Sequence, residues 1–269
     1  EVETLFNKAF DKSVKEDDFN IEEELKKPCF SKAGDLWHLG KHRVLCGDST
    51  KAESYDILLE GTKVNLVETD PPYLVAYEAK AGTIKNDDLN DEEGYKFLLS
   101  AFKNIYEHMA DDASIYVFHA DTKGLIFRKA FVDAGMYLSG CLIWVKDSLV
   151  LGRSVYQWRH EPVLYGWKRD GKHCWYSDRK QSTVLEFPRP KKNEAEHPTC
   201  KPIPLLAYLL KNSSMTNGIV LDPFLGSGST LIACEETDMV CRGIELDEKY
   251  MDVIVKRYYQ YFLKHKNSD

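Results

Sequence analysis

Short apolar runs alternate with amphipathic stretches along the chain from about residue 35 to residue 263. The apolar runs have the length and composition of buried β-strands. We expect strands at residues 35–39, 42–46, 64–67, 114–118, 142–145, 162–165, 219–221 and 240–246. Apolar residues three to four positions apart predict helices at 97–109, 125–135, 202–210, from the end of the 222–230 turn to 236, and from about 247 to 263. Strands that alternate with helices predict an α/β fold, in which a parallel sheet is covered on both faces.

Three segments do not follow this alternation. Residues 1–34 are mostly polar and predict an N-terminal helical or linker segment ahead of a folded domain at 35–269. Residues 74–94 are polar and rich in Gly and Asp, so we expect a mobile loop there. Residues 167–196 are basic, aromatic and irregular in pattern. These segments are the predicted connections around one large α/β core.

Composition narrows the class of protein further. Hydrophobic residues make up 43% of the chain and charged residues 29%, which is typical of a soluble globular protein. No run approaches the roughly 18 apolar residues of a membrane span, so no membrane association is expected. The seven cysteines are odd in number and none forms a C-x-x-C pair, which favours reduced thiols and predicts no metal site.

Charge is distributed unevenly, although the net charge is -7. Residues 153–192 carry ten Lys or Arg and four acids, whereas residues 86–112 carry eight acids and two Lys. A protein polarised in this way can present a basic face to phosphates while it is acidic overall.

A glycine-rich turn, Asp222-Pro-Phe-Leu-Gly-Ser-Gly-Ser-Thr230, joins a predicted strand to a predicted helix. Two glycines let the backbone approach a ligand closely at the carboxyl end of the sheet. No Lys follows them, so the turn is not a phosphate-binding Walker loop. Glu245 follows Gly226 by 19 residues, at the end of the next strand, where an acid can accept hydrogen bonds from ribose hydroxyls. The pair predicts a nucleoside site.

A second motif, Asp70-Pro71-Pro72-Tyr73, follows the strand predicted at 64–67 and therefore lies at the same sheet edge. The exocyclic amino group of adenine is a weak nucleophile, because its lone pair is delocalised into the ring. The carboxylate of Asp70 and the carbonyl of Pro71 can accept its two hydrogens and favour a tetrahedral nitrogen. Tyr73 offers a face on which an extruded base can stack. A sulfonium methyl donor needs neither a metal nor a covalent intermediate.

In their order along the chain, these motifs resemble those of the permuted β-class of DNA amino-methyltransferases, in which the catalytic tetrapeptide precedes the cofactor turn. The resemblance covers residues 35–262. It implies a Rossmann-like S-adenosylmethionine-dependent fold with a mostly parallel seven-stranded sheet, one antiparallel strand, and helices on both faces. It also implies methyl transfer to the N6 amino group of an adenine flipped out of DNA, as in restriction-modification systems.

The resemblance assigns roles to residues that match the family's motifs. Asp70, Pro71, Pro72 and Tyr73 would be catalytic. Thr199 and Lys201 match a His-Pro-Thr-Gln-Lys-Pro segment, in which Cys200 here replaces Gln. The full set implied to bind the cofactor is Asp48, Ser49, Thr199, Lys201, Asp222, Phe224, Gly226, Ser227, Gly228, Ser229, Thr230, Glu245 and Leu246.

Target recognition in the family lies before the His-Pro-Thr segment, which here leaves a short insertion at about 167–196. The expected partner is double-stranded DNA, a homodimer is compatible with the resemblance, and we expect a cytoplasmic protein of a bacterium or a phage. Residues 156–161 resemble a stretch that precedes the family's late core strand. Two interpretations stay open for this stretch, namely a border of the base pocket or a strand with a packed Trp158. Interleaved cations and aromatic rings suit phosphate contact and base stacking. The predicted DNA-binding residues are Arg153, Arg159, Lys168, Arg169, Trp175, Arg179, Lys180 and Lys191.

Two other functions remain open from the sequence. A DNA cytosine-N4 methyltransferase uses the same chemistry, although that group more often has Ser at the position of Asp70. A methyltransferase-like DNA-binding subunit without catalysis would not need both Asp70 and the complete glycine-rich turn. Carbon-5 cytosine methylation is rejected, because it needs a Cys nucleophile and Cys29 lies in a polar segment outside the sheet pattern.

Overall fold

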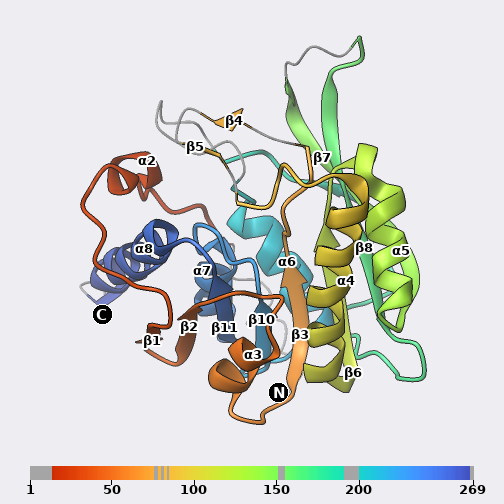
Figure 1. Cartoon of the computed structure of the whole chain (residues 1–269). Helices are drawn as coiled ribbons and strands as arrows, with labels where there is room; N and C mark the ends of the chain where they lie inside the picture. Colours follow the sequence, from red (N-terminus) through yellow and green to blue (C-terminus); the bar gives the residue numbers. More distant parts are fainter. Residues whose placement is uncertain are drawn as a thin grey trace.

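The computed structural model describes residues 14–75, 78–79, 82–83, 85–150, 155–190 and 200–266. Helices and strands alternate along most of this part of the chain (Figure 1). The helices are α2 (Ile21–Leu25), α3 (Ala52–Leu59), α4 (Asp91–His108), the 3-10 helix η1 (Asp121–Lys123), α5 (Gly124–Asp133), α6 (Ile203–Ser213), α7 (Ser229–Glu236) and α8 (Glu248–Lys266). The strands are β1 (Leu36–Leu39), β2 (His42–Cys46), β3 (Val64–Thr69), β4 (Glu78–Ala79), β5 (Gly82–Thr83), β6 (Met109–Phe118), β7 (Met136–Val150), β8 (Trp158–Lys168), β9 (Val184–Glu186), β10 (Ile219–Asp222) and β11 (Val240–Glu245).

Nine of the described strands form one sheet in the order β1-β2-β11-β10-β3-β6-β8-β7-β9. The strands from β2 to β6 in this order are parallel, β8 is antiparallel to both of its neighbours, and β7 runs with the parallel set. The seven central strands therefore confirm the predicted arrangement of a mostly parallel sheet with one antiparallel strand. Beyond the prediction, β1 pairs antiparallel and β9 parallel at the two edges.

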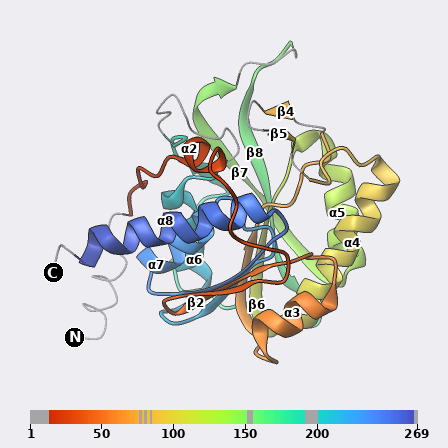
Figure 2. The same ribbon diagram turned by 60° about the vertical axis from the view of Figure 1, so that its left-hand side comes forward.

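Successive residues of each central strand enter different hydrophobic cores, one on each face of the sheet. In β3, Leu66 packs with α6, α7 and α8, whereas Val67 packs with α3, α4 and α5. Figure 2 shows α3 and α4 on the side of the sheet opposite to α8. Full burial of a Leu or Val side chain stabilises the fold by about 2 kcal/mol. Because helices cover both faces of the sheet, consecutive residues of a central strand, such as Leu66 and Val67, are both buried. This explains why the predicted strands are largely continuous apolar runs in which polar and apolar residues do not alternate.

The pairing of β3 with β10 sets the position of the functional site. Both strands end at the same sheet edge, but the chain after β3 continues to α4 on one face and the chain after β10 continues to α7 on the other. Diverging connections of this kind leave a crevice outside the carboxyl ends of the strands, where ligands bind in open α/β sheets.

Several element boundaries differ from the sequence-based expectation. Helix α4 begins at Asp91, inside the segment expected to be a loop, because Asn90 and Glu93 form a capping box around its first turn. Helix α3 was not predicted, although its Tyr55, Leu58 and Leu59 are buried. Strand β9 lies within the segment 167–196 that we expected to be irregular. A periodicity pattern does not capture the local cap that starts α4, the short α3, or the tertiary pairing that forms β9.

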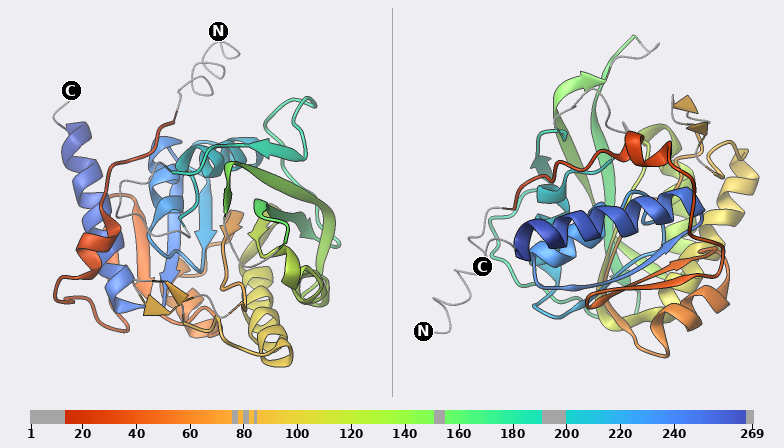
Figure 3. Two further views of the ribbon diagram at one scale, coloured as in Figure 1. Left: turned by 90° about the horizontal axis from the view of Figure 1, so that it is seen from above. Right: turned by 90° about the vertical axis from the view of Figure 1, so that its left-hand side faces the viewer.

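The described part of the N-terminal segment packs along α8 (Figure 3). Asp252 of α8 accepts hydrogen bonds from the backbone N–H groups of Phe30 (2.8 Å) and Ser31 (2.9 Å). The buried guanidinium of Arg257, also on α8, pairs with the Asp17 carboxylate at 2.6 Å. Residues 14–31 are therefore attached to the sheet domain by buried polar contacts. No described helix is long and apolar enough to cross a lipid bilayer.

Asp17→Asn is expected to lower the free energy of unfolding by about 3 kcal/mol, because it leaves the buried Arg257 charge without its carboxylate. Asp18→Asn is the matched control, since Asp18 pairs with Lys264 at the surface and exposed pairs contribute about 1 kcal/mol or less. Urea denaturation of both variants measures the difference. Equal losses in the two variants would contradict the anchoring role of Asp17.

Candidate active site

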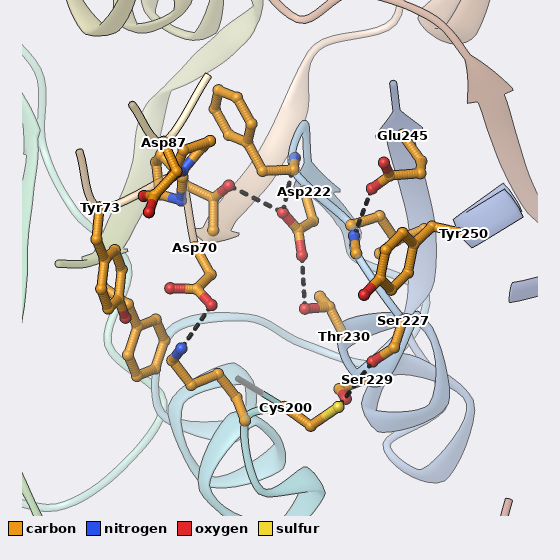
Figure 4. Close-up of a pocket in the computed structure, with 18 of the residues that line it drawn as sticks. Asp70, Tyr73, Asp87, Cys200, Asp222, Ser227, Ser229, Thr230, Glu245 and Tyr250 are labelled. Carbon is orange, nitrogen blue, oxygen red and sulfur yellow. Dashed lines mark hydrogen bonds and ion pairs between the residues drawn. The ribbon is translucent and has the colours of Figure 1, made fainter. Parts of the chain in front are cut away.

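A cavity of about 1210 Å³ opens at the carboxyl edge of the sheet (Figure 4). It lies between the loops that follow β2, β3, β10 and β11. The last residues of β7 and a residue near the start of β8 also line it. All four predicted catalytic residues and most of the predicted cofactor-binding residues line this cavity. Those lining it are Asp48, Ser49, Asp70, Pro71, Pro72, Tyr73, Lys201, Asp222, Phe224, Gly226, Ser227, Ser229, Thr230, Glu245 and Leu246.

A hydrogen bond joins the ends of the two strands that carry the motifs. The hydroxyl of Thr69, the last residue of β3, donates to Asp222 Oδ1 at the end of β10 over 2.8 Å. Asp222 also accepts from the Phe224 N–H (3.1 Å) and from the Thr230 hydroxyl (2.7 Å), as the dashed lines of Figure 4 show in part. Burial raises the pKa of Asp222 to about 6, although its three donors act in the opposite direction. Asp222 therefore organises the turn from inside the protein.

The glycines of the turn take backbone conformations that other residues rarely adopt. Gly226 has a φ of +53° and Gly228 a φ of +84°, both in the left-handed region. Gly228 does not line the cavity but permits the bend that begins α7, and a Cβ there would lie 3.3 Å from the Ile254 side chain. The N–H of Gly226 donates to Glu245 Oε2 at 2.7 Å, so the turn and the end of β11 are held together.

Glu245 also accepts a hydrogen bond at Oε1, from the Asp247 N–H at 2.8 Å. Burial raises the pKa of this carboxyl to about 7, against the effect of its two backbone donors. At neutral pH Glu245 is therefore close to its titration midpoint. A strand-end carboxylate in this state can pair with hydroxyl donors of a ligand.

The catalytic candidate Asp70 lies across the cavity from Glu245 (Figure 4). Its Oδ2 is 2.5 Å from the Lys201 ammonium, and its Oδ1 is enclosed with no hydrogen-bond partner within the described structure. Burial raises the pKa of Asp70 and the Lys201 charge opposes that change. A carboxylate oxygen that lacks a donor is the acceptor that an amino group needs.

Two further charged residues reach the same corner from β7 and β8. Glu161 Oε1 is 2.5 Å from the Lys146 ammonium, and Glu161 Oε2 is 3.4 Å from the Lys201 ammonium. The Tyr73 hydroxyl donates to Glu161 Oε2 over 2.9 Å. Glu161 belongs to the stretch for which a border of the base pocket was one of two interpretations, whereas sequence reasoning missed Lys146. The feature of the sequence that could have identified Lys146 is its position as a charged residue directly after the apolar run 142–145.

Aromatic rings form the wall between these charges. The Lys201 ammonium lies over the rings of Tyr73 and Phe118, at 5.1 and 5.4 Å from their centroids. Trp144 also lines the cavity, and its indole N–H donates to the Phe187 carbonyl at 2.8 Å. Polar groups among flat apolar faces suit a planar heterocycle.

Asp48 and Ser49 contribute to the cavity from the loop after β2. Asp48 Oδ1 accepts hydrogen bonds from both the backbone N–H (2.8 Å) and the hydroxyl (2.7 Å) of Thr50, so it stabilises its own turn. The Ser49 carbonyl accepts a hydrogen bond from Tyr55. No group of three or more His, Cys, Asp or Glu side chains placed to hold a metal ion occurs among the described residues.

Residues 64–256 match the sequence model of a DNA methylase family that acts on N6 and N4 amino groups. This match covers well over half of the chain.

The chain belongs to the N6/N4 DNA methylase family.

Individual relatives agree with this assignment. The DNA methylase is 27% identical over 236 residues to the type II methyltransferase M.HpaI of Haemophilus parainfluenzae, which covers 80% of this chain and 73% of that protein. Among solved structures, an M1.HpyAVI–SAM complex has a TM-score of 0.60 and 22% identity, covering 80% of this chain and 98% of the other. The cytosine-N4-specific PvuII DNA methyltransferase has a TM-score of 0.63 and 17% identity, covering 88% and 97%. The two structures show that the fold is shared.

The predicted DNA-binding residues of this DNA methylase are not gathered in one place. Arg159, near the start of β8, lies by the cavity edge, where its Nε donates to the Lys146 carbonyl at 2.9 Å. Lys168 and Arg169 follow from the other end of β8, at the opposite sheet edge, because β8 is antiparallel (Figure 1). Lys168 there pairs with Asp111 at 3.1 Å.

The other predicted DNA-binding residues are also spread over different parts of the fold. The Trp175 indole donates to the Asp178 carbonyl, and Arg179 and Lys180 are exposed beside it. Their neighbour Tyr176 contacts the end of α6 rather than the cavity. The chain returns to the cavity through β9, after which Arg189 lines it. Arg153, Lys191 and Thr199 lie outside the described residues.

Glu245→Gln is expected to alter how the stability of the DNA methylase depends on pH. The pKa of Glu245 is higher in the folded protein, about 7, than its ordinary value of 4.5. Its contribution therefore favours folding below pH 4.5 and is lost as the pH rises through 7. The difference in unfolding free energy, wild type minus variant, should fall by on the order of 3 kcal/mol between pH 4 and pH 8.

Urea denaturation at a series of pH values measures this difference. Glu60→Gln is the control, because the Arg43 side chain lowers the pKa of Glu60, so its difference should change in the opposite direction. A Glu245→Gln difference that stays constant with pH would contradict the raised pKa.

Proposed function

We propose that this DNA methylase transfers a methyl group from S-adenosylmethionine to the N6 amino group of an adenine flipped out of double-stranded DNA. One observation carries the proposal. The Thr69–Asp222 hydrogen bond holds the Asp70 corner and the glycine-rich turn together at one end of a single cavity. An acceptor for an amino group and a nucleoside-binding turn are thus side by side.

The residues present fit the cofactor. Near Gly226 a Cβ would find open space, with the Phe224 carbonyl 4.0 Å away, so the turn leaves its cavity side clear for a ligand. Glu245 would hold the ribose hydroxyls, and the residues of the turn that line the cavity would contact the remainder. When bound, the cofactor supplies an electrophilic sulfonium methyl group. The M1.HpyAVI structure, which shares the fold, is a complex with SAM and supports this choice.

The chain's own residues prepare the amine. Asp70 accepts one amino N–H and the Pro71 carbonyl accepts the other, which localises the nitrogen lone pair for attack. Asp70 would then accept the proton that the amino group loses when it is methylated. Tyr73 holds the base by stacking, and the aromatic wall excludes water from the reacting atoms.

The choice of adenine rests on Asp70, since the resemblance associates Ser at this position more often with cytosine-N4 transfer. Cytosine-N4 transfer is the second candidate, and the fold similarity to the cytosine-N4-specific PvuII enzyme favours testing it directly. Both bases present an amino group to the same acceptors, so nucleoside analysis of the product separates the two.

Transfer of a tritiated methyl group to DNA, followed by nucleoside analysis, should give label in N6-methyladenine. Asp70→Asn should lower kcat by about 10³-fold, because its amide is a poor proton acceptor, while the dissociation constant of the cofactor changes little. Asp133→Asn on the surface of α5 is the control and should keep wild-type activity. Label in N4-methylcytosine would establish the second candidate, and no label in either base would exclude both.

DNA is proposed to approach across the β7–β8 hairpin, which extends beyond the sheet edge (Figure 1). Tyr156 is 88% exposed and Trp158 is 37% exposed on this hairpin, close to Arg159. Arg189 lies at the cavity on the adjoining segment. Exposed aromatic rings beside cations suit an unstacked base and its flanking phosphates.

Arg159→Ala and Arg189→Ala should each reduce the slope of log binding constant against log salt by about 1, as the loss of one phosphate contact does. Arg179→Ala, at the opposite sheet edge, is the matched comparison and should leave the slope unchanged. Fluorescence anisotropy with a labelled duplex measures all three. A reduced slope for Arg179→Ala alone would place the DNA on the opposite edge of the sheet.

A further inference from the structure

Four side chains form a row of alternating charges beside the cavity. Lys146 of β7 pairs with Glu161 of β8, Glu161 with Lys201, and Lys201 with Asp70, over 2.5, 3.4 and 2.5 Å. Their side chains are 10%, 18%, 7% and 26% exposed in that order. The row starts on strands that are remote in sequence from the catalytic tetrapeptide and ends on its carboxylate.

Charges that are shielded from water act on one another more strongly than surface charges, because the effective dielectric constant is lower. Burial raises the pKa of Asp70, Lys201 lowers it, and Glu161 raises it. Burial alone would raise the pKa of Glu161, but Lys201 and Lys146 outweigh that effect and lower it. The protonation of Asp70 is therefore coupled to groups it does not touch.

We propose that Glu161 and Lys146 are positioning residues for methyl transfer, which act through Lys201 to keep Asp70 able to accept the amino proton. The role rests on the proposed function of Asp70. Glu161 also accepts the Tyr73 hydroxyl at 2.9 Å, so the same carboxylate orients the ring on which the base stacks.

The carboxylates of the row also compensate the Lys201 charge while the methyl group is transferred. When Asp70 takes the amino proton it becomes neutral, and Lys201 loses its nearer carboxylate. Glu161, 3.4 Å away, remains ionised and pairs with the ammonium, which stays compensated beside the methylated amine. The proton leaves Asp70 for solvent when the product base departs, which restores the original pairing.

Other groups also act on Asp70 and define what the test must hold constant. Tyr73 follows in the same loop and interacts with its carboxylate, and Asp222 approaches from β10. Neither residue contacts Lys146, and Glu161→Gln keeps a side-chain oxygen that can still accept the Tyr73 hydroxyl. Removal of the negative Glu161 must therefore favour ionised Asp70, and removal of the positive Lys146 must disfavour it.

The test is a carbon-13 NMR titration of the ligand-free protein labelled at aspartate carboxyls, with the Asp70 signal identified by its absence in Asp70→Asn. The Asp70 midpoint should move to lower pH in Glu161→Gln and to higher pH in Lys146→Met, each by on the order of one pH unit. Lys146→Arg keeps the charge and should restore the wild-type midpoint.

Glu60→Gln and Lys129→Met are the matched controls, because each removes one member of a surface ion pair and should leave the Asp70 midpoint in place. Midpoints that stay fixed, or that move in the same direction in both row variants, would overturn the proposal. If Lys146→Met fails to fold, Lys146→Gln gives the same comparison.

Activity separates this proposal from the function on which it rests. In each variant, the acid limb of the kcat–pH profile should shift in the same direction as the NMR midpoint of Asp70. It should therefore move to lower pH in Glu161→Gln and to higher pH in Lys146→Met. In Glu161→Gln, kcat should also be lowered, and the KM for DNA should change less. A purely structural role would lower activity without opposite shifts, which would count against the proposal. Opposite NMR shifts in a protein that transfers no methyl group would uphold the coupling and reject the proposed function alone.

Discussion

The hydrogen bond from Thr69 to Asp222 is the contact on which the active site depends. It connects the last residues of β3 and β10, two neighbouring parallel strands whose following loops diverge to opposite faces of the sheet. One loop carries Asp70 and the other the glycine-rich turn, more than 150 residues later in the chain. Parallel pairing of β3 and β10 brings both loops to one edge of the sheet. The crevice between diverging loops then supplies the cavity.

The sequence predicted the parts of this arrangement that local pattern determines. Asp70 and Glu245 were recognisable because each ends an apolar run, and the glycines because they let the backbone of a turn approach a ligand closely. The Lys146–Glu161 pair was not recognisable, because it arises from the antiparallel register of β7 and β8 and lies among residues that read as strand. The same register carries Lys168 away from the cavity, although basic composition had grouped it with Arg159.

Buried carboxylates provide the hydrogen-bond acceptors of the site, and their ionised forms are disfavoured by burial. Asp70, Asp222 and Glu245 all have raised pKa values, chiefly because burial disfavours their ionised forms. Hydrogen bonds to Asp222 and Glu245, and an ammonium beside Asp70, oppose that effect without cancelling it. A ligand that brings hydroxyl or amino donors relieves the imbalance. Under the proposed function, the amino group of the base would supply the donor that Asp70 Oδ1 lacks.

The most direct test of the account is a crystal structure of the protein with S-adenosylhomocysteine and a DNA duplex that contains its target site. The account predicts an extruded adenine against Tyr73, with its amino nitrogen about 3 Å from an Asp70 oxygen and the ribose of the cofactor product on Glu245. A structure in which the bound nucleoside or the extruded base lies away from the Asp70–Gly226 cavity would contradict it.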